Sequence, residues 1–194
     1  MTVIAAIAKD GNVIMGCDTA ATYGNTFIYK GEGKIVDITS GNGERILVGA
    51  AGNAAIMSVV KRDLGIFSTP SPDVSDEDAD DWANATAQGI TAILSECSPS
   101  LLSGGGDDAP SVDGMLMLAW RGHLWLVFTH SAIRPSNGIV AIGSGQDVAL
   151  GAMNAAVTFG ADPLDAVHEA VSLAATFADG CGVDDRGPLI YSTT

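Results

Sequence analysis

Short apolar runs separated by turn residues fill the first third of the chain, a pattern typical of β-strands. The runs at residues 2–8 and 12–17 are joined by the letters KDGN, whose Asp-Gly pair is a strong hairpin signal. Shorter runs at residues 26–29, 34–38 and 46–50 predict three more strands. We therefore expect a group of β-strands in this part of the chain.

Two segments with apolar residues at helical spacing follow, at residues 53–65 and at about 78–97. The second is preceded by Ser75, three residues before Asp78, which predicts a capping box at the start of the helix. The stretch SPSLLSGGGDDAPS after this segment predicts a flexible surface loop. Two helices thus separate the first strands from the second half of the chain.

The second half repeats this order. The stretch GMLMLAWRGHLWLVF predicts a hairpin that turns near residues 121–122, and GIVAIGSG predicts a buried strand. Two helices follow over 146–160 and 162–180, the second with Asp162 as N-cap and a proline behind it, before a last strand at 188–191. This order predicts an α+β fold in one domain, residues 1–194, with two antiparallel sheets between two pairs of helices in four αββα layers.

The charge of the chain narrows the classes of function. The 194 residues carry 23 acidic and 9 basic side chains, for a formal net charge of -14, which argues against binding nucleic acid or an anionic membrane surface. Eleven of the acids and no Lys or Arg lie within residues 63–113, and we interpret the region of about 71–113 as an acidic insert. A solvated helix face with a loop is the ordinary reading, and a contact surface for a basic partner is the alternative.

The spacing of the cysteines and the lengths of the apolar runs predict where in the cell the protein is found. The three cysteines have no CxxC spacing, which predicts free thiols in a reducing compartment, the cytoplasm. The first residues lack the basic stretch of a signal peptide, and no run reaches the roughly 18 apolar residues of a membrane span. We expect a soluble cytoplasmic protein without a membrane partner.

Several familiar motifs are incomplete. The stretch GSGQDV lacks the third glycine of a dinucleotide loop. Asp76, Asp78 and Asp80 have the alternation of a calcium loop, but Asp81 stands where that loop needs glycine and Ala87 where it needs its closing glutamate. The three histidines show no paired zinc spacing, and GxSxG is absent.

One constellation remains, formed by Thr2, Asp18, Lys34, Gly52 in GAAGNAA and Ser144 in IGSG. An N-terminal threonine freed of Met1 would carry a hydroxyl nucleophile and an α-amine that can serve as its general base. A buried lysine would favour the deprotonated nucleophile, and it needs a carboxylate partner because an unpaired buried charge is very costly. A glycine turn after a strand can direct backbone N–H groups at an oxyanion.

These residues lie in stretches that resemble the proteasome β-type family, in particular its HslV-like peptidases of two-part, ATP-dependent proteases. The similar stretches are TVIAAIAKDGNVIMGCD, ATYGNTF leading to KGEGKIV, ILVGAAGNAA and GIVAIGSGQDVALGAMNAA, in the family's order over nearly the whole chain. The family pattern places an Asp sixteen positions after its N-terminal Thr and a Lys sixteen positions further on. Thr2, Asp18 and Lys34 have this spacing.

The resemblance implies an N-terminal nucleophile hydrolase fold and a role for each residue. Thr2 would be the nucleophile, Asp18 and Lys34 a buried pair, Gly52 an oxyanion donor and Ser144 a group that organises the amine. Hydrolysis would need no cofactor. Main-chain oxygens at Ala178, Cys181 and Asp184 would be the counterparts of a monovalent cation (Na+) site.

The implied activity is endopeptidase cleavage of unfolded polypeptides inside stacked hexameric or heptameric rings of this chain. An AAA+ unfoldase ring would deliver the substrates, and ATP would be used by that partner alone. Two other functions stay open: an amidase or acylase that uses the same nucleophile on small molecules, and a catalytically silent structural ring subunit that retains Met1.

Each of the five residues also has an ordinary structural explanation. Thr2 could simply begin an edge strand, Asp18 could cap a turn, and Lys34 could be an exposed strand lysine. Gly52 could end a strand and Ser144 could be a loop serine. Their joint spacing, rather than any single residue, favours the catalytic interpretation.

Overall fold

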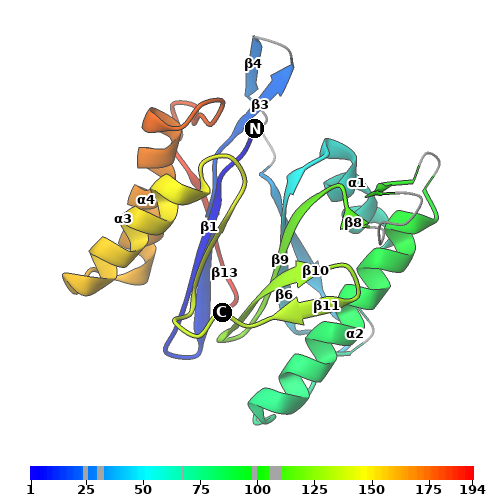
Figure 1. Cartoon of the computed structure of the whole chain (residues 1–194). Coiled ribbons are helices and arrows are strands. Elements are labelled where there is room, and N and C mark those ends of the chain that lie inside the picture. The colour runs from blue at the N-terminus through cyan, green and yellow to red at the C-terminus, as the bar shows by residue number, and fades with distance from the viewer. Residues whose placement is uncertain (24–25, 30–32, 67, 98–99, 105–110) are drawn as a thin grey trace.

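The computed structural model describes residues 1–23, 26–29, 33–66, 68–97, 100–104 and 111–194. The elements follow the predicted order of strands, two helices, strands, two helices and a last strand (Figure 1). Within the described residues, no helix combines the length and the apolar character that crossing a membrane requires.

Two antiparallel sheets form the centre of the molecule. The first has the strand order β12-β1-β2-β13, with bounds Ile139–Ile142, Ile4–Lys9, Asn12–Cys17 and Leu189–Ser192. The second has the order β11-β10-β9-β6-β5, with bounds Ser131–Ile133, His123–Phe128, Gly114–Trp120, Arg45–Gly52 and Ile35–Thr39. Two small hairpins are added: β3 with β4 (Ala20–Tyr23, Thr26–Tyr29) and β7 with β8 (Leu102–Ser103, Ser111–Val112).

Each sheet is covered on its outer face by two helices. Helices α3 (Gln146–Thr158) and α4 (Pro163–Phe177) lie against the first sheet, and α1 (Ala54–Asp63) and α2 (Asp76–Ser95) lie against the second (Figure 1). The side chains of Asn53, Ser75 and Asp162 cap α1, α2 and α4 by accepting backbone N–H bonds. The structure therefore has the predicted four αββα layers.

Strand β1 shows why its sequence is an almost unbroken apolar run. Ala5 and Ile7, like Val3 just before the strand, pack against α3 and α4, whereas Ile4 and Ala6 pack between the two sheets. Because successive side chains of a strand point to opposite faces, a strand buried on both faces must be apolar throughout. The central position of β1 also fixes the residues that immediately precede it.

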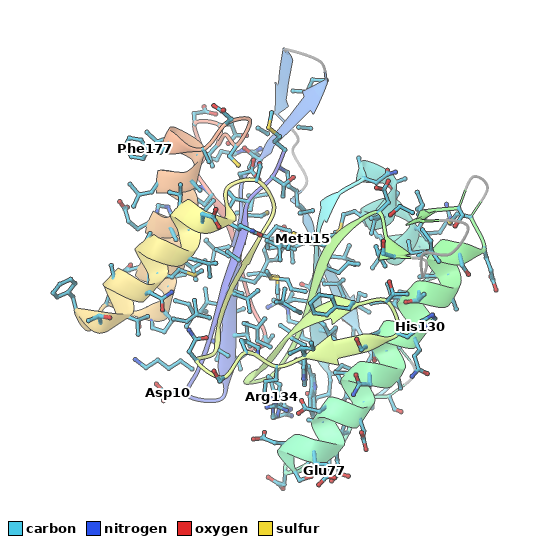
Figure 2. All side chains as sticks on the ribbon, viewed as in Figure 1. Asp10, Glu77, Met115, His130, Arg134 and Phe177 are labelled. Atoms are coloured by element: carbon cyan, nitrogen blue, oxygen red, sulfur yellow. The ribbon has the colours of Figure 1, made fainter. Side chains whose placement is uncertain are left out.

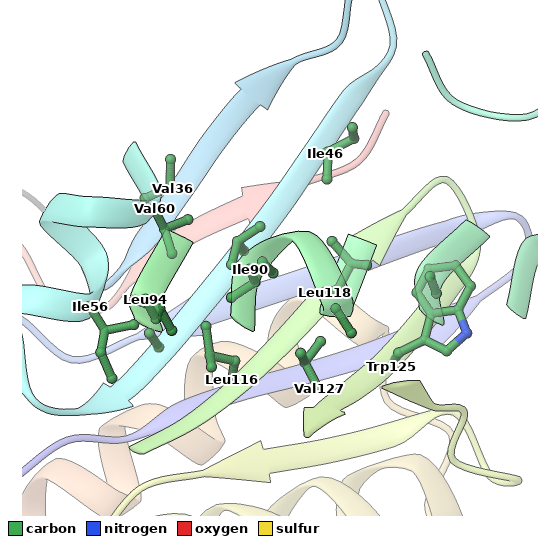
Figure 3. Packing of buried hydrophobic residues seen from close by; sticks show 14 of the residues in the cluster. Val36, Ile46, Ile56, Val60, Ile90, Leu94, Leu116, Leu118, Trp125 and Val127 are labelled. Atoms are coloured by element: carbon green, nitrogen blue, oxygen red, sulfur yellow. The ribbon is translucent and has the colours of Figure 1, made fainter. Parts of the chain in front are cut away.

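The second sheet packs against α1 and α2 through a core that Figure 3 shows at close range. Leu116 and Leu118 of β9 and Trp125 of β10 face Ile90 and Leu94 of α2 in this cluster (Figure 3). All five side chains are at most 1% exposed. This core holds β6 in place, and β6 carries Gly52 at its end.

Some details of the prediction are wrong. Helix α2 begins at Asp76, two residues before the predicted start, although the capping contact from Asp78 N to Ser75 Oγ is present at 3.2 Å. Strands β3, β7, β8 and β11 were not predicted, because runs of two to four residues carry too little periodicity. Part of the predicted loop forms the β7–β8 hairpin, and its residues 98–99 and 105–110 lie outside the described residues.

The acid-rich helix α2 is also more than a solvated face. Arg134, from the turn after β11, forms ion pairs with Asp76 at 2.8 Å and with Asp80 at 2.7 Å. The Trp125 indole N–H donates to Asp80 at 2.6 Å. Part of the acidic surface therefore fixes α2 to the second sheet.

Candidate active site

The register of the first sheet brings three of the predicted residues together. Ile4 of β1 pairs with Cys17 of β2 on one side and with Ile142 of β12 on the other. Continuing both registers beyond the strand ends places Asp18 and Ser144 on either side of the segment Thr2–Val3. The sixteen-residue spacing between Thr2 and Asp18 is thus a consequence of the β1–β2 hairpin.

Lys34 reaches the same place from the other sheet. It immediately precedes β5, and its carbonyl accepts a hydrogen bond from Ala50 N of β6 at 3.2 Å. Its Nζ donates to Asp18 Oδ1 at 2.6 Å, so an ion pair joins the two sheets. The site lies at the end of the sandwich where the N-terminus and the β3–β4 hairpin are found, away from the C-terminus (Figure 1).

The Asp18 carboxylate is fully buried and accepts three hydrogen bonds. Its side chain is 0% exposed and that of Lys34 is 12% exposed. Besides Lys34, Val3 N donates to Oδ1 at 3.0 Å and Gly182 N donates to Oδ2 at 3.2 Å. A buried ion pair is tolerable when further hydrogen bonds satisfy its remaining lone pairs, as they do here.

The Ser144 side chain contacts the backbone nitrogen of Thr2. It lies between β12 and α3, and its Oγ accepts the Thr2 N–H at 3.2 Å. Thr2 itself is 8% exposed, and its carbonyl accepts the N–H of Gly145 at 3.2 Å. The backbone of Thr2 is therefore held at both its nitrogen and its carbonyl oxygen.

The Met1 carbonyl contacts the side chains of both Thr2 and Lys34. It accepts hydrogen bonds from Thr2 Oγ1 at 2.7 Å and from Lys34 Nζ at 3.2 Å. The Thr2 nitrogen is then an amide, which cannot act as a base. The Thr2 hydroxyl and the Lys34 ammonium therefore lie on the same side of the Met1–Thr2 peptide.

Gly52 lies across the cleft from these residues. A hollow of about 120 Å³ is lined by Thr2, Lys34 and Gly52, among others. Gly52 has a φ of +116°, and a Cβ on it would lie 2.6 Å from Gly114 Cα, so only glycine fits at this strand end. Gly52, the last residue of β6, therefore lines the same hollow as Thr2.

The loop between α4 and β13 completes the site. The Gly182 carbonyl accepts the N–H groups of Thr19 and Ala20 at 3.0 and 2.9 Å, and the Thr19 hydroxyl accepts the N–H of Asp184 at 2.9 Å. Together with the Gly182–Asp18 bond, these contacts tie the loop after α4 to the residues that follow β2. Sequence reasoning missed Thr19 and Gly182, because their contacts are mostly made by the backbone and leave no residue signature.

The same loop holds the predicted cation ligands. The carbonyl of Ala178 accepts the N–H of Cys181 at 3.4 Å, and that of Asp184 accepts the N–H of Gly187 at 2.9 Å. Each oxygen keeps a second lone pair, so main-chain coordination remains compatible with the loop. The Asp184 carboxylate pairs with Arg186 instead. Among the described residues, no three His, Cys, Asp or Glu side chains are grouped so that they could hold a metal ion.

Two thiols lie near the site, and neither is an activated nucleophile. Burial raises the pKa of Cys17 to about 12, and it also raises the pKa of Cys181. A reactive cysteine instead needs a lowered pKa, because the thiolate is the nucleophile. Cys181 Sγ lies 3.6 Å from Ser144 Oγ, so it borders the site as a packed neutral group.

Comparison with known proteins bears on the fold. No protein-family model matches the sequence. The structure of Thiobacillus denitrificans BPH in complex with epoxomicin superposes with a TM-score of 0.75 at 20% identity, over 98% of this chain and 97% of that chain. A second structure of Thiobacillus denitrificans BPH gives 0.75 at 21% identity, over 98% and 96% of the two chains.

Eukaryotic HslV from Trypanosoma brucei superposes with a TM-score of 0.68 at 17% identity, over 98% of both chains. These matches span both sheets and all four helices, since they cover almost the whole chain. They confirm the expected fold: the chain has the four-layer architecture of HslV-like N-terminal nucleophile hydrolases.

Proposed function

We propose that this chain is a threonine peptidase whose nucleophile is the Thr2 hydroxyl after removal of Met1. The observation that carries the proposal is the buried ion pair next to Thr2, in which Lys34 Nζ lies 2.6 Å from Asp18 Oδ1. The backbone N–H groups of Val3 and Gly182 donate the other two hydrogen bonds to the Asp18 carboxylate. Burying an ion pair costs free energy, because both charges lose their hydration. A buried lysine next to a threonine hydroxyl is therefore typical of a site that lowers the pKa of a nucleophile.

The reaction follows from the positions of these groups. The free α-amine of Thr2 takes the hydroxyl proton, directly or through water, while Oγ1 attacks the peptide carbonyl carbon. The Gly52 N–H stabilises the oxyanion, and Lys34 favours negative charge on the attacking oxygen. The C–N bond then breaks as the leaving amine takes the proton, and an ester on Oγ1 remains. Water, deprotonated by the same amine, hydrolyses the ester.

Ser144 contributes by orienting the amine, since its Oγ already accepts the Thr2 N–H at 3.2 Å. No cofactor takes part in these steps. A monovalent cation such as Na+ would be held by main-chain oxygens of Ala178, Cys181 and Asp184, and it would stiffen the loop that contacts Asp18.

Assembly into stacked hexameric or heptameric rings, fed by an AAA+ unfoldase ring that uses ATP, belongs to the same proposal. The substrates would be unfolded polypeptides. Large apolar side chains at the surface support self-association: Phe159 is 90% exposed and Phe177 is 72% exposed (Figure 2 labels Phe177). A cytoplasmic location agrees with three free cysteines.

The test is cleavage of unstructured casein and of short peptide amides by protein whose intact mass shows loss of Met1. We expect cleavage of both, and no cleavage by Thr2→Ala. Cleavage of small amides alone would favour the amidase alternative. A protein that keeps Met1 and cuts nothing would favour the silent ring subunit. Light scattering on the same sample gives the number of subunits.

A further inference from the structure

Two glycines face each other where β6 and β9 meet, beside the hollow that Thr2 lines. The strand register pairs Gly52 with Gly114, and a Cβ on Gly52 would lie 2.6 Å from Gly114 Cα. A Cβ on Gly114 would in turn overlap the carbonyl oxygen of Ala51. The two backbones therefore approach too closely for a side chain on either residue. Without a Cβ, Gly52 has wide conformational freedom, so its φ of +116° must be held by its neighbours.

Strand alternation places the Gly52 N–H on the side of Lys34. Backbone N–H groups along a strand point in turn to its two neighbours. In β6 the Ala50 N–H donates to the Lys34 carbonyl at 3.2 Å, and the Asn53 N–H, just beyond the strand, donates to the Asp113 carbonyl at 3.2 Å. The Gly52 N–H lies between them in the alternation and points the same way as that of Ala50. This is the side of the hollow that Lys34 lines.

Asn53, the residue after this glycine, is bound twice by Asp113. Besides the backbone bond, the Asn53 side-chain Nδ2 donates to Asp113 Oδ2 at 3.0 Å. The Oδ1 atom of the same amide accepts the N–H of Ala55 at 3.0 Å, which caps helix α1. Both ends of the Asn53 amide are thus engaged, so the chain direction immediately after Gly52 is fixed from β9 and from α1.

Asp113 is itself anchored to the core of the second sheet. It immediately precedes β9, and its N–H donates to the Leu101 carbonyl at 3.0 Å. Leu101 is 6% exposed and belongs to the cluster that α1 and α2 form with this sheet. The backbone of Asp113 is therefore fixed. Asn53 and Asp113 are both exposed, so their side chains can be exchanged without disturbing the core.

We propose that Asp113 is a positioning residue, whose side chain acts through Asn53 to hold the Gly52 N–H in the orientation that the oxyanion requires. This inference rests on the proposed function for the role of Gly52. It adds a residue from another part of the chain to the five of the catalytic constellation. The Asp113 carboxylate acts as a hydrogen-bond acceptor and not through its charge, so an asparagine at this position can take its place.

The first test is the hydrolysis of a peptide amide by protein that lacks Met1. Asp113→Ala should lower kcat about tenfold, the scale of one hydrogen bond to a charged group. The loss should stay below the roughly hundredfold cost of removing an oxyanion donor itself. KM should stay constant, because the contact matters only once charge develops on the substrate oxygen. Asp113→Asn should retain kcat within about twofold, and a loss equal to that of Asp113→Ala would overturn the inference.

Exchanging the two side chains is the second test. Asn53→Asp keeps an N-cap for α1 but brings two carboxylates together, so kcat should fall at least as far as in Asp113→Ala. The double variant Asn53→Asp/Asp113→Asn restores one donor and one acceptor, and it should recover kcat to within about threefold. A double variant no better than Asn53→Asp would overturn the inference. Asp63→Ala, which removes an exposed carboxylate at the other end of α1, is the control and should leave kcat unchanged.

Hydrogen exchange separates this inference from the proposed function, because it requires no cleavage. Exchange at the Asn53 N–H, followed by mass spectrometry, should be about tenfold faster in Asp113→Ala and unchanged in Asp113→Asn. If no variant cuts a peptide but the exchange changes in this way, the proposed activity fails and Asp113 still holds the Gly52–Asn53 segment. If peptides are cut and Asp113→Ala leaves kcat unchanged, the activity stands and the inference is overturned. Unchanged exchange overturns it in either case.

Discussion

Two groups of ion pairs among the described residues lie at opposite ends of the sandwich, and their surroundings differ sharply. At the N-terminal end Asp18 is 0% exposed, and its carboxylate accepts bonds from Lys34, Val3 and Gly182. At the other end Arg134 pairs with Asp76 and Asp80, whose side chains are 79% and 39% exposed. Figure 2 labels Arg134 and Asp10 at the same end of the sandwich, opposite the end where Figure 1 marks the N-terminus.

The second cluster is built around aromatic rings. The His123 ring stacks between Trp120 and Trp125, with centroids 5.6 Å away on both sides, and its Nδ1 lies 2.6 Å from Arg134 Nη1. The Arg134 guanidinium lies 5.3 Å from the Trp125 ring centroid. These contacts join α2 to β10. None of the residues in this cluster lines the hollow beside Thr2. One ion pair is thus buried beside Thr2, whereas the other group of pairs holds a helix to a sheet.

The largest expected effect is at the buried pair. Asp18→Asn or Lys34→Met should each lower kcat/KM by about a thousandfold. Lys34→Met removes the positive charge that favours the deprotonated Thr2 hydroxyl, and Asp18→Asn removes the carboxylate that holds this charge in place. Peptide hydrolysis is measured on samples whose near-ultraviolet circular dichroism shows a folded protein. The matched control is Arg62→Met, which removes an exposed pair with Asp63 and should leave the activity unchanged.

Thr19 should have the next largest effect, as a positioning residue. Its buried hydroxyl accepts the Asp184 N–H, and its own N–H donates to Gly182, which in turn contacts Asp18. Thr19→Val keeps the shape of the side chain but leaves the Asp184 N–H without its acceptor. We expect kcat to fall about tenfold, near the cost of one lost hydrogen bond to a buried group. Thr19→Ser should restore kcat, and KM should stay constant in both. Equal loss in the serine variant would contradict a role for the hydroxyl.

Arg134 should affect stability and leave activity intact. Arg134→Met removes the ion pairs and the contact with Trp125, and we expect the free energy of unfolding to fall by about 1–2 kcal/mol, a low value because the carboxylates are partly exposed. Urea denaturation at fixed protein concentration measures this change. Loss of peptidase activity in a folded Arg134→Met protein would break the division between the two clusters.

The smallest effect is a pH dependence of stability at the same cluster. Burial, and then the Arg134 charge, lower the pKa of His123 below its ordinary value of 6.5, while Asp76 and Asp80 act in the opposite direction. The unfolded chain therefore binds the proton more readily, and stability should fall as the pH drops from 6.5 toward the lowered pKa of the folded state. His123→Gln should flatten this slope in urea denaturation, and His168→Gln should not.

The sequence predicted the parts of the site that depend on strand register and on side-chain identity. The KDGN turn indicates the β1–β2 hairpin, and that hairpin alone brings Asp18 next to Thr2–Val3. Lys34 and Gly52 could be placed only through the family resemblance, because their proximity depends on the packing of two sheets. The contacts of Gly182 use backbone atoms that every residue has, so no pattern of letters indicates them.

The acid-rich segment illustrates a second limit. Its charge predicted a solvated face, whereas Asp76 and Asp80 pair with Arg134, which is 58 and 54 residues away in the sequence. Local composition gives the polarity of a helix face, but it does not indicate which distant cation will meet it. Short strands such as β11, which brings Arg134 into place, are equally hard to recognise from three residues.

The central claim is that the free N-terminal Thr2 is the nucleophile, and covalent labelling tests it most directly. Protein whose intact mass lacks Met1 is incubated with a peptide that carries an electrophilic group, and the labelled fragment is identified by tandem mass spectrometry. The account predicts one adduct per chain on Thr2, and much slower labelling in Asp18→Asn. An unlabelled Thr2 in protein with a free amine, or an adduct on another residue, would contradict it.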